Sequence, residues 1–108
     1  MGEINSSEEI VSRLRQQVRN DAVRITLHAN HEMNEESISY SSMAQAMLTG
    51  KVIENYPTHQ RGACCLICGK DASGRFLHIC CTTSLDVIIV ITAYEPKLPK
   101  WLDPYNRR

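Results

Sequence analysis

The sequence predicts an α+β fold in which N-terminal helices pack on a small antiparallel β-sheet of about four strands. Between residues 10 and 18, apolar residues recur every four positions, which is the pattern of an amphipathic helix. Residues 61–96 contain three apolar runs, near 63–69, 75–82 and 86–94, and turn residues bound each run as they bound buried strands. Residues 51–56 alternate in polarity, which predicts a fourth strand. A chain of 108 residues has the size of one domain, which we expect to span 1–108.

The first helix, within residues 1–22, is marked at its start and along one face. Ser6 and Glu9 have the spacing of a capping box, in which each side chain accepts a hydrogen bond from the backbone amide of the other residue. One narrow apolar stripe runs along the helix: Ile10, Leu14, Val18. We therefore expect this helix to lie on the surface of the core, with its arginines turned outward.

Two more helices are expected before the main strands. Thr26 is placed to cap a short helix over residues 28–35, and Ser39 or Ser41 is placed to cap a third helix over 42–49. Gly50 follows as the C-terminal stop. Residues 23–27 alternate in polarity, which suits either a short strand or an extended lead into the second helix.

The apolar runs of residues 61–96 predict an antiparallel meander, with a type I turn at Asp71–Gly74. Alternation places two sets of residues on shared faces: Phe76, His78 and Cys80 on the middle strand, and Ile88, Val90, Thr92 and Tyr94 on the last. Antiparallel pairing then brings Thr92 and Tyr94 opposite His78 and Phe76. Arg75 begins the middle strand at that same end. We expect a polar corner of Arg75, His78 and Tyr94 on an otherwise apolar sheet.

Composition and charge limit the classes of function. Apolar residues make up 43% of the chain and the formal net charge is zero, which indicates a folded chain and excludes a disordered or membrane-embedded one. The longest apolar run, Val87–Ile91, is far shorter than the roughly 20 residues of a spanning helix. The N-terminus lacks the order of a signal peptide. We therefore expect no membrane association and a cytoplasmic location.

Charge is distributed unevenly along the chain. Residues 1–50 carry four basic and seven acidic residues, whereas residues 51–108 carry eight basic and five acidic ones. An anionic partner is therefore expected on the sheet and tail, although an imbalance this small also arises by chance. The tail, residues 97–108, contains too many prolines for a helix or strand. We expect Trp101 and Leu102 to pack back onto the domain, leaving Arg107 and Arg108 free.

Five cysteines raise the alternative of a zinc or thiol site. Cys65 and Cys68 have the spacing of a metal knuckle, and Cys80-Cys81 would complete a four-sulfur set with them. In a strand, however, Cys65 and Cys68 point to opposite faces, and a zinc knuckle needs both sulfurs at one point. Buried reduced thiols that act as small apolar residues are the preferred interpretation. We expect no metal and no cofactor.

Several segments, taken in order, resemble a small bacterial family known as domain of unknown function 4258. The matching residues are His28-Ala29, Met33, Ile38, Gly50–Pro57, Cys65-Leu66 with Gly69, Gly74-Arg75 with Leu77-His78, Ile91–Pro96 and Trp101. They define a family-like core over residues 25–101. No single match is specific, but their order and spacing together are.

The resemblance implies both a fold and a function. Members resemble toxins of small toxin–antitoxin gene pairs, and their helices followed by a sheet are similar in layout to RelE-type messenger-RNA endonucleases and to barnase. It implies a type II toxin that cleaves RNA and binds a cognate antitoxin protein, without binding DNA directly. One position departs from the family pattern: Glu36 stands where an arginine is common, and an acidic side chain cannot hold a phosphate.

RNA cleavage without a metal needs a base, an acid and a cation for the charge that builds on the phosphate. His78 suits either proton-transfer role, and Arg75 offers a planar fork that matches phosphate oxygens. Tyr94 can position the substrate or protonate it. Glu54 can orient His78 or act as the base, and His28 is a further candidate acid or base. These five residues form the predicted catalytic set.

Each of the five also has a purely structural interpretation. His78 can donate to a neighbouring carbonyl, Tyr94 can be a core-edge aromatic, and Arg75 can be a solvated turn residue. Glu54 can simply pair with a nearby cation. A different class of function stays open as well, namely a non-catalytic module whose sheet edge or apolar groove binds a partner protein.

Overall fold

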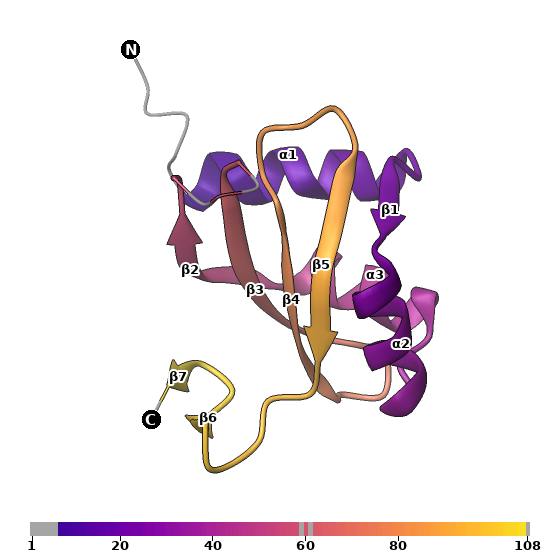
Figure 1. The fold of residues 1–108 in the computed structure, drawn as a ribbon, viewed down its shortest axis with the longest axis vertical. Coiled ribbons are helices and arrows are strands. Elements are labelled where there is room, and N and C mark those ends of the chain that lie inside the picture. Colours follow the sequence, from indigo (N-terminus) through magenta and orange to yellow (C-terminus); the bar gives the residue numbers. More distant parts are fainter. Residues whose placement is uncertain (1–6, 59, 61, 108) are drawn as a thin grey trace.

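Five strands form one sheet in the order β1–β5–β4–β3–β2 within the part of the chain that the computed structural model describes, residues 7–58, 60 and 62–107. Figure 1 shows the long strands β3, β4 and β5 side by side. The bounds are β1 Val23–Ile25, β2 Lys51–Tyr56, β3 Cys64–Lys70, β4 Phe76–Thr82 and β5 Ile88–Tyr94. The predicted α+β class is confirmed. The predicted antiparallel pairing is confirmed for three pairs of strands: β2 with β3, β3 with β4, and β4 with β5.

A fifth strand extends this sheet beyond the predicted four. Residues Val23–Ile25 form β1, which pairs parallel to β5 with Val23 opposite Ile88. The sheet is therefore mixed rather than wholly antiparallel. Of the two interpretations of residues 23–27, the short strand is correct. Its partner lies more than sixty residues along the chain, so local alternation could not indicate the pairing.

Three helices occupy the described N-terminal half: α1 Ser7–Arg19, α2 Leu27–Glu35 and α3 Tyr40–Thr49. The predicted caps of the second and third helices are confirmed. Thr26 accepts a hydrogen bond from the Ala29 amide at 3.1 Å, and Ser39 accepts one from the Ser42 amide at 3.0 Å. The predicted cap at Ser6 lies outside the described residues. No described helix is long and apolar enough to cross a membrane.

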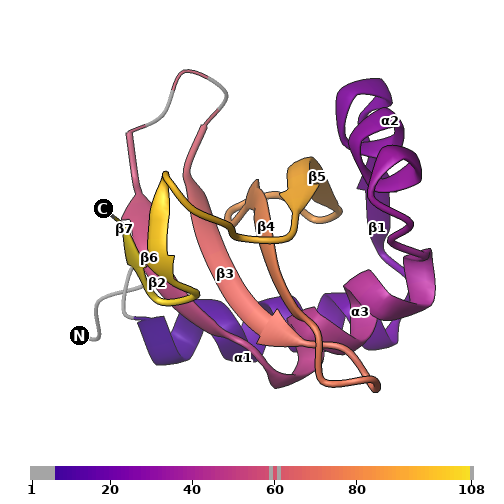
Figure 2. The same cartoon turned by 90° about the horizontal axis from the view of Figure 1, so that it is seen from below.

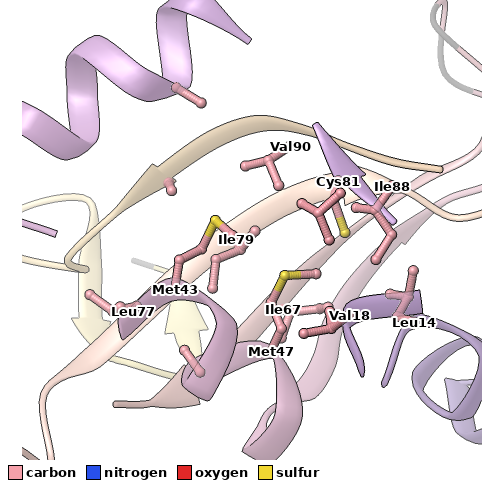
Figure 3. Packing of buried hydrophobic residues seen from close by; sticks show 14 of the residues in the cluster. Leu14, Val18, Met43, Met47, Ile67, Leu77, Ile79, Cys81, Ile88 and Val90 are labelled. Atoms are coloured by element: carbon pink, nitrogen blue, oxygen red, sulfur yellow. The ribbon is translucent and has the colours of Figure 1, made fainter. Parts of the chain in front are cut away.

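Helices α1 and α3 lie on the same side of the sheet (Figure 2), and the core lies between them and the sheet. Figure 3 shows how Met43 and Met47 of α3 point toward Ile67 and Ile79 of the sheet. Leu77, Ile79 and Cys81 of β4 all belong to this core. As predicted, Phe76, His78 and Cys80 therefore lie on the other face, which we call the open face. Burial of the apolar side is the main force that holds the helices on the sheet.

Two details of the predicted register are wrong. Tyr94 lies opposite His78 and Thr92 opposite Cys80, which is two residues away from the expected pairing. Val90 pairs with Cys81, so Ile91 is an extra residue that forms a β-bulge. The bulge reverses the alternation of β5: Val90 and Ala93 face the core, whereas Thr92 and Tyr94 line the open face. Ile88, Val90, Thr92 and Tyr94 therefore do not share one face.

The tail is ordered into a hairpin, contrary to the prediction of no strand. Its strands are β6 Trp101–Asp103 and β7 Asn106–Arg107. Trp101 is buried as expected, but Leu102 is 62% exposed. Arg107 is not free, because its guanidinium binds Glu54. The packing of Trp101 and the pairing of Arg107 hold a proline-containing segment in strands that its composition does not favour. Arg108 lies outside the described residues.

Candidate functional site

The C-terminal hairpin covers part of the open face and seals His78 beneath it. The Trp101 and His78 ring centroids are 4.2 Å apart in an edge-to-face arrangement, and His78 has an exposed fraction of 0%. On the same hairpin, Tyr105 packs edge-to-face on Phe76 at 5.6 Å between centroids. The middle strand therefore presents its open-face aromatic residues to the tail rather than to solvent.

Both ring nitrogens of His78 have a partner. Nε2 lies 2.5 Å from the Pro104 carbonyl oxygen, and Nδ1 lies 3.2 Å from the Tyr94 hydroxyl. Because a carbonyl can only accept, Nε2 carries the proton and Nδ1 accepts from Tyr94. Burial lowers the pKa of His78 below its ordinary 6.5, so the imidazole is neutral at neutral pH. Tyr94 lines an open pocket, so it connects the buried imidazole to solvent.

Protonation of His78 is expected to destabilise the fold. Since the folded-state pKa lies below the ordinary 6.5, the unfolded chain binds more protons in that range. The contribution of His78 to the free energy of unfolding is therefore fully present above about pH 6.5 and is lost as the pH falls below it. Urea unfolding at a series of pH values measures this dependence. His78→Gln should remove it, and His31→Gln, a change at an exposed histidine, should retain it; an unchanged slope in His78→Gln contradicts the assignment.

Glu54 holds a second cluster on the open face. Its carboxylate accepts two hydrogen bonds from Arg107, at 2.8 and 3.0 Å, and a third from the Tyr56 hydroxyl. The hydrogen bond from Arg107 lowers the pKa of Glu54, which keeps it ionised. Burial and the neighbouring Glu54 raise the pKa of Tyr56 to about 12, which keeps its hydroxyl protonated. The Arg107 guanidinium also lies 4.6 Å from the Trp101 ring centroid. This cation–π contact joins the Glu54 cluster to the part of the C-terminal hairpin that covers His78.

An open pocket of about 440 Å³ lies beside these two clusters. Its floor comes from neighbouring strands, through Leu66, Cys80 and Thr92. Tyr56 on β2 and Tyr94 on β5 also line it, and β3 and β4 lie between those two strands. The tail contributes two cations to the lining, Lys100 and Arg107. The Arg107 guanidinium is within electrostatic range of both tyrosine hydroxyls.

Carboxylates from α2 form the opposite wall of the pocket. Glu32 accepts from the Ala93 amide at 2.8 Å and from the Thr92 hydroxyl. Glu36 accepts from the Glu95 amide at 2.8 Å. β1 pairs with β5 only as far as Val90, so these side chains satisfy the backbone where the strand partner ends. Part of the negative charge of Glu32 and Glu36 is therefore stabilised by hydrogen bonds from β5 and from the Glu95 amide.

A family model described as domain of unknown function (DUF4258) matches residues 25–95. The chain belongs to this family. The match covers about two thirds of the chain and includes all five predicted catalytic residues. α1 and the C-terminal hairpin, which carries Lys100 and Arg107, lie outside the match to DUF4258. No curated protein and no solved structure matches the chain.

The DUF4258 match places the five predicted residues in one domain, but only three of them come together. Glu54, His78 and Tyr94 meet beneath and beside the C-terminal hairpin. Arg75 donates to Glu95 at 3.1 Å and to the carbonyls of Glu36 and Ser37, so it fastens the junction of α2 and α3. His28 is 71% exposed on α2, with its Nε2 3.9 Å from the Glu32 carboxylate.

Sequence reasoning missed three pocket residues. Tyr56 follows Glu54 by two positions, so strand alternation alone could have placed them together. Lys100 and Arg107 lie in the tail, which was expected to have no regular structure. Only the general excess of basic residues in the second half of the chain indicated a cationic surface there.

The cysteines of the alternative zinc or thiol site are divided between the two faces of the sheet. Cys65 and Cys81 lie opposite each other on the core side, whereas Cys68 and Cys80 belong to the open face. Burial raises the pKa of Cys68 and of Cys80 to about 11, so these thiols are protonated and unreactive at neutral pH. Among the described residues, no group of three or more potential ligands is arranged to hold a metal ion.

Proposed function

We propose that this protein is a metal-independent endoribonuclease that acts in the cytoplasm as the toxin of a toxin–antitoxin pair. The observation that carries the proposal is the pocket that Tyr56, Tyr94 and Arg107 line together, in which the Tyr94 hydroxyl is hydrogen-bonded to the buried His78. RNA is the substrate class, and the antitoxin is the protein partner. The family resemblance supports the toxin role, and the pocket supports the chemistry.

In this mechanism, His78 is the base and acts through Tyr94. The ribose 2′-hydroxyl gives its proton to the Tyr94 oxygen while the Tyr94 proton moves to Nδ1 of His78. The pKa of Tyr94 is raised by burial, so the phenol passes a proton on rather than accumulating as a phenolate. The resulting imidazolium keeps its hydrogen bond from Nε2 to the Pro104 carbonyl.

The freed 2′-oxygen then attacks phosphorus, and the bond to the 5′-oxygen breaks. Lys100 gives a proton to that leaving oxygen, so the products are a 2′,3′-cyclic phosphate and a 5′-hydroxyl. Arg107 stabilises the negative charge that builds on the phosphate oxygens, which is the role first expected of Arg75. Glu54 and Tyr56 position Arg107 through the hydrogen bonds described above.

The carboxylates of the α2 wall limit where RNA can lie. Glu32, Glu36 and Glu95 line the pocket on the side of α2, and like charge there disfavours phosphate. Lys100 and Arg107 line the side of the hairpin. The RNA backbone is therefore placed along the hairpin, with its bases toward the strands.

Cleavage of end-labelled single-stranded RNA by the purified protein, with EDTA present, tests this function. We expect fragments ending in 2′,3′-cyclic phosphate, at a rate that decreases below pH 6.5 as His78 becomes protonated. Arg107→Ala should reduce the rate by about 10²- to 10³-fold. Arg24→Ala, which removes an exposed arginine on β1, is the matched control and should have no effect.

The same assay is repeated with ribosomes translating a messenger RNA. If both free RNA and translated messenger stay intact, the proposed function is wrong. Equal cleavage by wild type and Arg107→Ala would place the activity elsewhere, or in a contaminant.

A further inference from the structure

A second hollow lies at the edge of the sheet that is farther from α2, between α1 and β2. It has a volume of about 580 Å³. Its lining includes Glu8, Val11, Arg15 and Arg19 from one face of α1, Val52 from β2, and Gly50, the C-cap of α3. We call this hollow the α1–β2 trough. None of its residues belongs to the proposed active site.

The trough runs beside the outer edge of β2. β2 is the last strand in the sheet order, and no strand pairs with its outer side in the described part of the chain. Figure 1 shows β2 at the margin of the sheet, next to one end of α1. An exposed edge of this kind accepts an extended peptide as an added strand. β2 has six residues and a bulge at Ile53, so main-chain pairing is short and the side chains of the trough must add to affinity.

Charge in the trough favours an acidic occupant. Arg15 reaches across it and donates to the Gly50 carbonyl at 3.0 Å, and its Nε is buried without a hydrogen-bond partner among the described residues. Arg19 is exposed on the same face of α1. Two guanidinium groups thus stand against the single carboxylate of Glu8, while Val11 and Val52 supply apolar contact.

We propose that the α1–β2 trough is a docking site for an extended acidic segment of a partner protein, which adds as a strand to the outer edge of β2. Because neighbouring residues of a strand point to opposite faces, every second side chain of this segment faces α1. These side chains are acidic: their carboxylates meet Arg15 and Arg19, and their methylene groups lie against Val11 and Val52. The site is independent of RNA cleavage, because it lies across the sheet edge from the pocket that contains Arg107.

A fluorescein-labelled peptide, acetyl-Glu-Val-Glu-Val-Glu-Val-amide, tests the proposal with the full-length protein. We expect saturable binding by fluorescence anisotropy and slower hydrogen exchange of outward-facing amides in residues 51–56. Arg19→Glu should weaken binding at least about tenfold, because it places like charges together. Arg24→Glu makes the same change in net charge on β1 and should leave affinity unchanged.

Two altered peptides separate strand addition from simple charge attraction. A version N-methylated at alternate residues should not bind, because it cannot pair with β2, and a version with lysine for glutamate should not bind either. The proposal is overturned if no binding is measured, if the N-methylated peptide binds equally well, or if amides of β2 exchange as before. Protection of β2 by single-stranded RNA, or by self-association of the protein, in place of the acidic peptide would also overturn it.

Discussion

A Tyr94→Phe variant is expected to cleave RNA about 10²- to 10⁴-fold more slowly than the wild type. The hydroxyl of Tyr94 is the hydrogen-bonding contact between the pocket and His78, which is otherwise sealed by Trp101 and Pro104. Phenylalanine preserves the ring, and so the packing, but leaves Nδ1 of His78 without a donor and without a path for the proton. The loss should appear in kcat, because the proton is transferred in the transition state.

Tyr40→Phe is the matched control, since Tyr40 is 42% exposed at the start of α3 and does not line the pocket. Both variants should give the circular dichroism spectrum of the wild type. If Tyr94→Phe cleaves as fast as Tyr40→Phe, His78 is not the base, and its role is confined to holding the C-terminal hairpin.

Gly69→Ala is expected to destabilise the protein by more than about 3 kcal/mol, beyond the usual range for overpacking. A methyl group on Gly69 would lie 1.9 Å from the Ala46 carbonyl oxygen and 2.9 Å from Gly50 Cα. These are backbone atoms of α3 and of the start of β2, so no side-chain rotation can relieve the contact. α3 must separate from β3, which removes a large share of the about 5–15 kcal/mol that stabilises a typical domain.

Gly74→Ala provides the comparison by urea denaturation. Nothing lies within 4 Å of a methyl group at Gly74, but the residue has a φ of +87° in the turn between β3 and β4. Only backbone strain therefore opposes that change, and its cost is about 1–2 kcal/mol. If Gly69→Ala is no less stable than Gly74→Ala, the close packing of α3 on β3 is wrong.

Local patterns in the sequence were sufficient to predict most of the elements. The period of four in α1, the caps at Thr26 and Ser39 and the alternation of β4 each depend on neighbours in the chain. β1 and the bulge at Ile91 do not. β1 is held by a partner far along the chain, and the bulge is supported from outside its strand by Thr26, whose hydroxyl donates to the Ile91 carbonyl at 3.2 Å.

The candidate site was predictable to the extent that it follows strand alternation. His78 and Tyr94 were expected together, and they meet although the register was wrong. The observed pairing differs from the predicted one by two residues, and a shift of two keeps Tyr94 on the open face. Arg75 was chosen for its chemistry, but its donors are used by Glu95 and by carbonyls of the α2–α3 junction. Arg107 replaces it through a tail that folds back over the sheet, and such a long-range contact leaves no local pattern.

The carboxylates of α2 have a consequence for assembly. Glu32 accepts from the Ala93 amide near the end of β5, Glu36 accepts from the Glu95 amide just after it, and β1 itself has only three residues. In the described part of the chain the sheet is thus monovalent, because the β2 side alone offers an edge strand longer than three residues. If two copies join through β2, each copy uses its β2 edge for the other, and no β2 edge is left to pair with a third copy. Such a chain can close into a dimer but cannot polymerise into a cross-β fibre while it stays folded.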